Sequence, residues 1–221
     1  MRPETIISGR NLQFDKTSGQ EPQAGSVTAD LGGTMHPLLR TSTMLDTIID
    51  RVAMVFVWSS ILLMLAVIYD VITRYFGLPR GFGLNATKLQ ESEYWFHTLL
   101  FSFTLAWAYR RQAHVRIDLI RDRLPLKVKF LIEILGCLLF LIPYAVITFY
   151  FTLDYVEHSF AQQEVSKSGV GLPHTWIIKS TIPLMFLLLA IAGVSQLLKS
   201  VAGFIGVLPD NQVTSTLGGD N

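Results

Sequence analysis

The chain has 221 residues, of which half are hydrophobic and only 16% are charged, against about 25% charged residues in ordinary soluble domains. The mean hydropathy is +0.41 and the net charge is +1. So few charges cannot cover the surface of a soluble fold of this size, and the balanced charge gives no sign of nucleic-acid binding. The single cysteine, Cys137, excludes an intrachain disulfide and a CxxC site. Composition therefore predicts a membrane protein.

Residues 1–43 are rich in Gly, Ser, Thr and Gln and show no sustained periodicity, which is typical of a disordered tail. The first long apolar run is Val52–Ile72. At about 1.5 Å per residue, a helix over this run is long enough to cross a hydrocarbon core about 30 Å thick. We predict the first transmembrane helix here.

A second and weaker apolar run extends from Tyr94 to Tyr109, which is short for a span, and a start at Leu89 restores the length with Glu91 and Glu93 in the first turn. Aromatic residues lie near both of its ends, as in the aromatic belts of membrane helices. Thr98, Ser102 and Ala106 recur at every fourth position, which predicts a small-residue face for close helix packing. We interpret this run as the second transmembrane helix.

The basic segment 110–129 follows the second run. Its apolar residues Ile117, Ile120 and Leu124 recur with helical spacing, and Pro125 closes the pattern. A basic amphipathic helix of this kind is typical of the membrane surface, where anionic lipid attracts it. The segment predicts a short interfacial helix.

Two further apolar runs, Phe130–Leu153 and Thr175–Leu198, complete the pattern. The sequence therefore predicts an all-α integral membrane protein, with a four-helix transmembrane domain at residues 44–200 and a short C-terminal tail at 201–221. Lys and Arg residues are concentrated in the segments that share one side with both termini. By the positive-inside rule, both termini and the central basic segment are cytoplasmic.

One alternative is a redox anchor that holds haem between two histidines of the bundle. Such ligation needs two imidazoles at matching depth. Only His97 lies well within a predicted span, whereas the other histidines fall in the tail or the loops. A second alternative is a stand-alone channel of four spans.

Glu93 and His97 are four residues apart and share one helix face. Ionisable groups inside a membrane are candidates for a proton or ion relay. Interfacial anchoring, or a polar contact with another subunit, is the simpler interpretation. No further row of acidic residues continues a path across the predicted spans.

Two basic clusters are also candidates for contact with other molecules. One follows the second span and suits either attraction to lipid or docking against a membrane partner; it consists of Arg111, His114, Arg116 and Asp118. The other lies on the opposite side, where it suits either a soluble partner or a solvated rim; it consists of Arg74, Arg80 and Lys88.

Sequence motifs for nucleotide hydrolysis, for a nucleophilic serine and for metal binding are missing: no GxxxxGK[ST], GxSxG, HExxH or DxDxDG pattern occurs. The sequence therefore predicts no catalytic residue, no metal ligand and no cofactor.

Two short motifs resemble a known transporter family. The run AWAYRRQAHVRIDLIRDRLP contains an HVRxD element after the second span, and an E-x-S…LP…K…P element precedes and enters the fourth. Both resemble the small permease, or Q-type, subunit of tripartite ATP-independent periplasmic (TRAP) transporters. The residues of this sequence that match are His114, Val115, Arg116 and Asp118, followed by Glu164, Ser166, Leu172, Pro173, Lys179 and Pro183.

The resemblance implies a non-catalytic subunit in the bacterial inner membrane. TRAP systems import organic acids, such as dicarboxylates and sugar acids, with a sodium gradient and a periplasmic solute-binding protein. A large permease subunit carries the transport sites, and the small subunit is expected to act as a scaffold beside it. The expected partners are therefore the large permease, the binding protein and membrane lipid.

Overall fold

The computed structural model describes residues 36–77, 79, 81, 83–114 and 123–217, and all regular structure among them is helical. The predicted tail up to residue 35 lies outside this part, as does segment 115–122 of the predicted interfacial helix. The helices are α1 (Pro37–Val57), α2 (Ser59–Tyr75), α3 (Ala86–Arg110), α5 (Leu126–Gly136), the π-helix η1 (Cys137–Leu141), α6 (Ile142–Ala161), α7 (Trp176–Lys179), α8 (Thr181–Ile205) and α9 (Asp210–Leu217).

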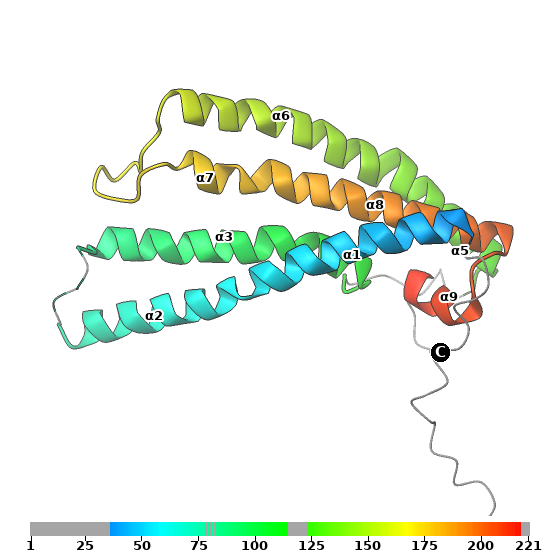
Figure 1. Cartoon of the computed structure of the whole chain (residues 1–221), viewed down its shortest axis with the longest axis horizontal. Coiled ribbons are helices and arrows are strands. Elements are labelled where there is room, and N and C mark those ends of the chain that lie inside the picture. Colours follow the sequence, from blue (N-terminus) through cyan, green and yellow to red (C-terminus); the bar gives the residue numbers. More distant parts are fainter. Residues whose placement is uncertain (1–35, 78, 80, 82, 115–122, 218–221) are drawn as a thin grey trace, which may run out of the picture. The chain divides into compact units, whose positions relative to one another are not determined.

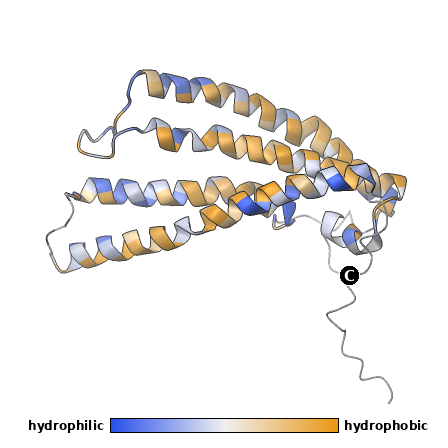
Figure 2. Cartoon of the chain, in the orientation of Figure 1, coloured by the Kyte–Doolittle hydropathy of each residue, from blue (hydrophilic) through white to orange (hydrophobic). Residues whose placement is uncertain are grey.

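Three of the described helical stretches are long and apolar enough to cross a membrane: Pro37–Tyr75, Leu126–Ala161 and Trp176–Ile205. They contain the first and third predicted spans and all of the fourth except Thr175, and they are coloured mainly as hydrophobic in Figure 2. The fourth long helix, α3, contains the second predicted span but is more polar than the other three.

The first helix begins at Pro37, inside the range that composition assigned to the tail. Proline suits the first turn of a helix because its φ is already helical and its missing N–H is not needed there. The polar first half of α1 is amphipathic: Ser42, Asp46, Ile49 and Ala53 recur at intervals of three and four and are all buried.

A short irregularity at Trp58 separates α1 from α2, and the two helices continue in nearly the same direction (Figure 1). The hydroxyls of Ser59 and Ser60 donate to the carbonyls of Phe56 and Val57 at 2.6 and 2.7 Å. Such local side-chain bonds compete with the helical ladder and give the backbone an alternative at this point.

Helix α3 packs against α1, α2 and α8. Asn85 caps its start by accepting from the backbone N–H of Lys88 at 2.7 Å. The predicted small-residue face is found in part, because Ser102 and Ala106 are buried while Thr98 is half-exposed. Next to this face, the rings of Phe103 and Phe56 stack with centroids 3.7 Å apart.

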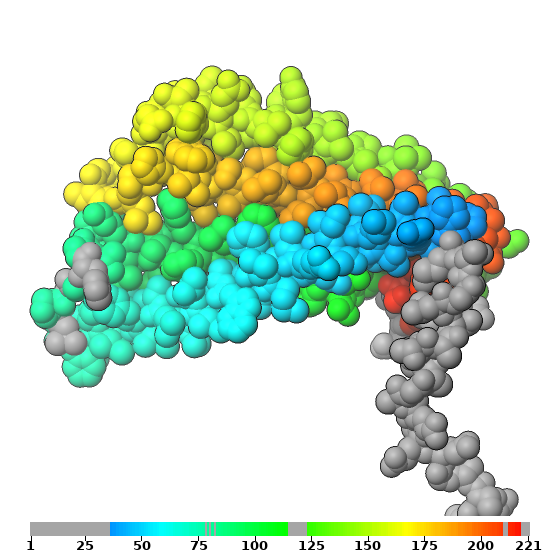
Figure 3. Space-filling view, in the orientation of Figure 1, coloured from blue at the N-terminus to red at the C-terminus, as the bar shows by residue number. Residues whose placement is uncertain are grey.

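The third long helix is continuous from α5 through η1 to α6. Its π-helical turn ends just before Pro143, whose ring would clash with a carbonyl of a regular preceding turn. Helix α8 packs on α6, α5, α3 and α1. In the space-filling view, the orange band of α8 lies between the bands of α6 and α1 (Figure 3).

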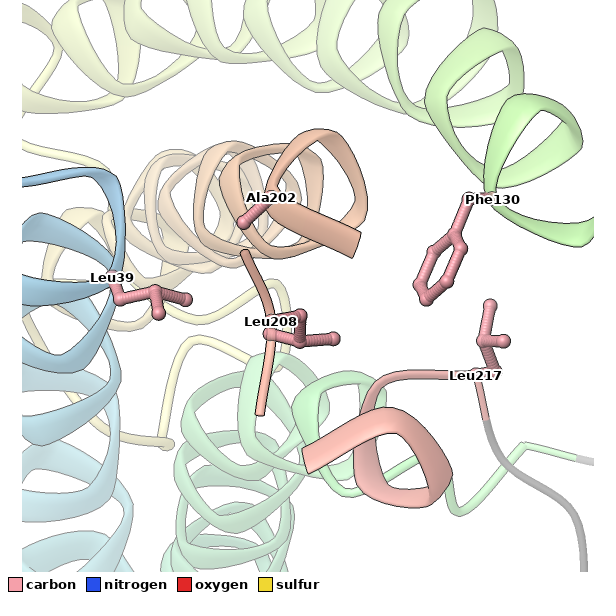
Figure 4. Packing of buried hydrophobic residues seen from close by; sticks show 5 residues of the cluster. All are labelled: Leu39, Phe130, Ala202, Leu208 and Leu217. Atoms are coloured by element: carbon pink, nitrogen blue, oxygen red, sulfur yellow. The ribbon is translucent and has the colours of Figure 1, made fainter. Parts of the chain in front are cut away.

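The bundle has two ends. We call the end where α1 begins and α8 finishes the tail end, and the end with the connections α2–α3 and α6–α7 the loop end (Figure 1). At the tail end the chain turns at Gly206, with φ of +83°, and continues as α9. A small apolar core holds this part together (Figure 4); it consists of Leu39, Phe130, Ala202, Leu208 and Leu217. The sequence had indicated only a short tail here.

Candidate functional site

A polar cluster at the loop end joins the start of α3 to the long connection between α6 and α7. We call it the loop lock and define it as Glu91, Ser159, Glu164, Ser166 and Lys179. Glu91 accepts from the hydroxyl of Ser166 and from the backbone N–H of Leu172, the latter at 2.6 Å. These two bonds fold the connection over the first turns of α3.

The second half of the loop lock centres on Glu164. Its carboxylate accepts from the Lys179 ammonium and, at 2.7 Å, from the Ser159 hydroxyl. These two hydrogen bonds hold the pKa of Glu164 below its ordinary value of 4.5. The Lys179 nitrogen also lies 4.2 Å from the centre of the Tyr155 ring, a cation–π contact.

Gly171 is the point of closest approach in this connection. A Cβ atom at this position would overlap the Glu91 carboxylate. The Ser166 hydroxyl would be overlapped as well, so a larger residue here would have to displace these two side chains, and glycine lets the connection pass without that displacement.

A second polar cluster joins α1, α3 and α8 at the tail end. We call it the tail network and define it as Ser42, Asp46, Asp50, Arg110, Ser195 and Lys199. Asp46 accepts from the Lys199 ammonium at 2.5 Å and from the Ser195 hydroxyl at 2.6 Å, and Arg110 lies 3.5 Å from it. Arg110 also pairs with Asp50. Because Asp46 is only 8% exposed, its charge depends on these partners.

No contact is described between Glu93 and His97, the two candidates in α3 for a proton or ion relay. Oε1 of Glu93 is buried and has no hydrogen-bond partner among the described residues. The side chain of His97 is exposed on the helix surface. The arrangement therefore gives no support to a relay between these two groups.

The predicted basic arm is described only at its beginning. The guanidinium of Arg111 lies 5.5 Å from the centre of the Trp107 ring, and the His114 ring lies 6.3 Å from that of Tyr109. Arg116 and Asp118 lie outside the described residues.

Of the predicted outer basic cluster, Arg74 pairs with Asp70 at 2.5 Å while most of its side chain stays exposed. The side chain of Lys88 is half-exposed in the first turn of α3, and Arg80 lies outside the described residues. Of the two motif prolines, Pro173 is exposed in the connection and Pro183 is buried near the start of α8.

The structure thus brings Glu164, Ser166 and Lys179 together, as members of one motif. Sequence reasoning missed Glu91, the partner of Ser166 on α3, and most of the tail network. The spacing of Ser42, Asp46 and Asp50 on one helix face was the signal for the first half of α1, but Ser42 had been assigned to the tail, and Asp46 and Asp50 precede the first predicted span at Val52. Within the described residues, no group of three or more His, Cys, Asp or Glu side chains is placed to hold a metal ion.

One comparison with known proteins identifies the family. The model of the DctQ component of tripartite ATP-independent periplasmic transporters matches residues 63–203. The chain belongs to this family. The match confirms the resemblance predicted from the motifs, and it spans the whole loop lock. No curated protein and no solved structure is significantly similar to the chain. The protein is therefore a helical membrane component of a TRAP-type transporter.

Proposed function

We propose that the chain is the non-catalytic small membrane subunit of a sodium-coupled TRAP importer, which takes organic acids from a periplasmic solute-binding protein. The observation that carries this proposal is the DctQ match over residues 63–203. In this role, the subunit scaffolds the large permease and holds no transport site of its own.

We further propose that α3 is the fourth transmembrane helix. Its 25 residues extend about 37 Å at 1.5 Å per residue, enough to cross a hydrocarbon core. Three neighbouring helices, α1, α2 and α8, shield much of its surface from lipid. A helix covered in this way can carry more polar residues than one that faces lipid, which accounts for its lower hydropathy.

The scaffold role is supported by where polar and apolar groups lie. Lys179 pairs with Glu164 within the loop lock, and Lys199 pairs with Asp46 within the tail network, so that these charges are compensated at each end of the bundle. Between the ends, α2, η1 and α6 expose large apolar side chains suited to lipid or to a membrane-embedded partner; examples are Ile61, Leu65, Ile68, Phe140, Ile147 and Phe151.

The charge distribution supports an orientation in the bacterial inner membrane with the tail end in the cytoplasm. The loop end then faces the periplasm, where Arg74 and Lys88 are available to a binding protein. The segment with Arg116 and Asp118 lies on the cytoplasmic side in this orientation and is proposed as a docking arm for the large permease.

The proposal is tested by co-expressing the tagged chain with the large permease and binding protein of the same genome. We expect the chain to co-purify with the large permease in detergent. Reconstituted vesicles should accumulate a labelled organic acid, from a panel of dicarboxylates and sugar acids, only with a sodium gradient and all three proteins. Uptake by the chain alone, or full uptake without it, would contradict the scaffold role.

The docking arm has its own test in the same complex. Replacing Arg116 and Asp118 with alanine should weaken co-purification with the large permease. Replacing Arg74, Arg80 and Lys88 with glutamate should instead lower uptake while the membrane complex still assembles. Unchanged recovery of the complex in the first case, or unchanged uptake in the second, would remove the assigned role.

A further inference from the structure

A polar cavity of about 470 Å³ lies at the tail end, beside the tail network. Four parts of the chain form its walls: α1, the end of α3, α8, and the C-terminal helix α9. The lining residues are Thr43, Asp46, Arg110, Arg111, Gln112, Lys199, Gln212, Thr214, Ser215 and Thr216.

The charges in this lining favour an anion. Three of the lining residues, Arg110, Arg111 and Lys199, are cations, and Asp46 is the one carboxylate among them. Asp50, outside the lining, pairs with Arg110, so that one net positive charge remains at the site. Lys199 and Ser195 already bond to Asp46, so that its charge is compensated within the wall. Arg111 contacts the ring of Trp107, which leaves its N–H groups available to a ligand.

Unpaired donors are buried at the same place. Nε of Arg110 and Oγ1 of Thr216 have no hydrogen-bond partner within the described part of the chain, and Thr216 is only 1% exposed. Oε1 of Gln112 is a third atom in this condition, and it is an acceptor. Buried polar groups without partners are costly, so such a cluster indicates an occupant that bonds to them.

We propose that this cavity binds a phosphate group. A phosphate offers several acceptor oxygens to two guanidinium groups, an ammonium and a hydroxyl, a combination that suits its geometry and charge. A hydroxyl on the ligand, either P–OH or that of an ester substituent, would donate to Gln112. The group can come from a phospholipid headgroup or from a soluble phosphate compound, since both present the same chemistry to these residues.

Two hydrogen bonds in the wall of the cavity hold α9 against the bundle. The backbone carbonyl of Thr216 accepts from Gln112 at 3.1 Å and from Gln196 at 2.7 Å. These two bonds fix the side of the cavity that α9 supplies. The site therefore needs the C-terminal helix as well as the charged residues of the tail network.

The test uses the full-length chain in lipid-depleted detergent, with two probes in separate arms. Inorganic phosphate is titrated by calorimetry against sodium chloride of equal ionic strength, and phosphatidylglycerol binding is followed by native mass spectrometry. We expect saturable binding in at least one arm. Binding of phosphate alone identifies a soluble ligand, whereas binding only of phosphatidylglycerol identifies a lipid headgroup.

Three variants locate the binding. Arg111→Gln should weaken it about tenfold or more, the ratio expected for the loss of one charge-assisted hydrogen bond. Thr216→Val keeps the charge and shape of the wall and should weaken it at least about threefold. Lys127→Gln removes an exposed positive charge at the same end that does not line the cavity, and should leave binding unchanged.

The proposal is overturned if neither probe binds saturably. It is also overturned if Lys127→Gln weakens binding as much as Arg111→Gln, because general attraction to a basic surface would then suffice. If Thr216→Val binds the probe with the affinity of the parent protein, the probe does not bind in this cavity. All variants are first compared by cooperative thermal unfolding, so that a loss of binding is measured on folded protein.

Discussion

The two polar clusters of this bundle join distant parts of the chain in different ways. In the tail network, the charged side chains of one helix bond to those of another, and Asp46 is almost fully buried. In the loop lock, side chains bond largely to a connection and its backbone, and the Glu164 side chain remains 30% exposed. One cluster fixes helices, and the other fixes a loop.

This difference determines how much each cluster contributes to stability. Breaking one partner of a buried ion pair leaves an uncompensated charge and is strongly destabilising. In the loop lock, the Glu164 side chain is 30% exposed against 12% for Asp46, so that solvent screens its pairing with Lys179 more strongly. The tail network is therefore expected to govern assembly of the bundle, and the loop lock to govern the conformation of one surface segment.

The family match divides the two clusters in the same way. Residues 63–203 include every member of the loop lock, whereas Ser42, Asp46 and Asp50 precede this range. Three of the six residues of the tail network thus come from the first half of α1, outside the matched part. Glu164 and Lys179 of the second predicted motif lie at the loop end, within the matched range.

The largest effect is expected from Asp46→Asn. The substitution removes the charge that compensates Lys199 and Arg110 in a buried place, and it should lower the free energy of unfolding by about 3 kcal/mol. The measurement is reversible or scan-rate-controlled thermal unfolding of the purified chain in detergent, where the midpoint should fall clearly.

Asp154→Asn is the matched control for Asp46→Asn. Asp154 is 74% exposed and lies 3.5 Å from His158, so its loss should cost less than about 0.5 kcal/mol. Adding Lys199→Met to Asp46→Asn should recover part of the stability, because the unpaired ammonium is then removed as well. Equal effects of the two single aspartate substitutions would contradict the burial argument.

The next effect tests packing at the tail end. The ring of Phe130 lies directly against Gly203, where an added Cβ atom would overlap it. Gly203→Ala should therefore destabilise by about 2 kcal/mol, as overpacking of a rigid core does. Gly136→Ala is the control, because nothing lies within 4 Å of that Cβ position. It should stabilise helix α5 by about 0.5–1 kcal/mol. The same sign for both substitutions would be inconsistent with the observed packing.

The outline of this fold could be predicted from the sequence because hydrophobic thickness is a local property. Three of the predicted spans coincide with described helices that are long and apolar enough to cross a membrane. The family resemblance, confirmed by the DctQ match, came from short motifs that also are local. The first helix was predicted to start too late, because only the apolar run from Val52 was interpreted as a span, whereas the polar face of α1 with Ser42 and Asp46 precedes that run.

The clusters themselves could not be predicted, since their partners lie far apart in the sequence. Ser42 meets Ser195 across 153 residues, and Glu91 meets Ser166 across 75. No periodicity within either segment indicates its partner. The folding of α9 onto the bundle likewise depends on Phe130, Gln112 and Gln196, which belong to three other elements.

A smaller effect is expected from Gly171→Ala at the loop end. The new Cβ atom would push the Glu91 carboxylate away from Ser166 and Leu172, but this carboxylate ends a flexible side chain and can move. We expect a loss of about 1 kcal/mol, less than at Gly203, together with faster proteolysis of the connection at residues 162–175. Gly81→Ala, with nothing near its Cβ position, should change neither. A larger loss here than at Gly203 would reverse the proposed ranking of the two ends.

The smallest effect is the pH dependence of the loop lock. Its hydrogen bonds with Lys179 and Ser159 lower the pKa of Glu164 below 4.5, so the folded state binds a proton at this carboxyl less readily than the unfolded state does. The resulting stabilisation is present above the ordinary pKa and is lost as the pH falls through the lowered value. The protection factors of the amides in the connection, which are measured relative to the intrinsic exchange rate at each pH, should therefore fall below about pH 4.5 in the parent protein. Glu164→Gln cannot titrate, and its protection factors should already be low at pH 7 and show no further fall on acidification. Parental pH dependence in Glu164→Gln would assign the effect to another carboxylate, such as Glu91, and would separate the two halves of the lock.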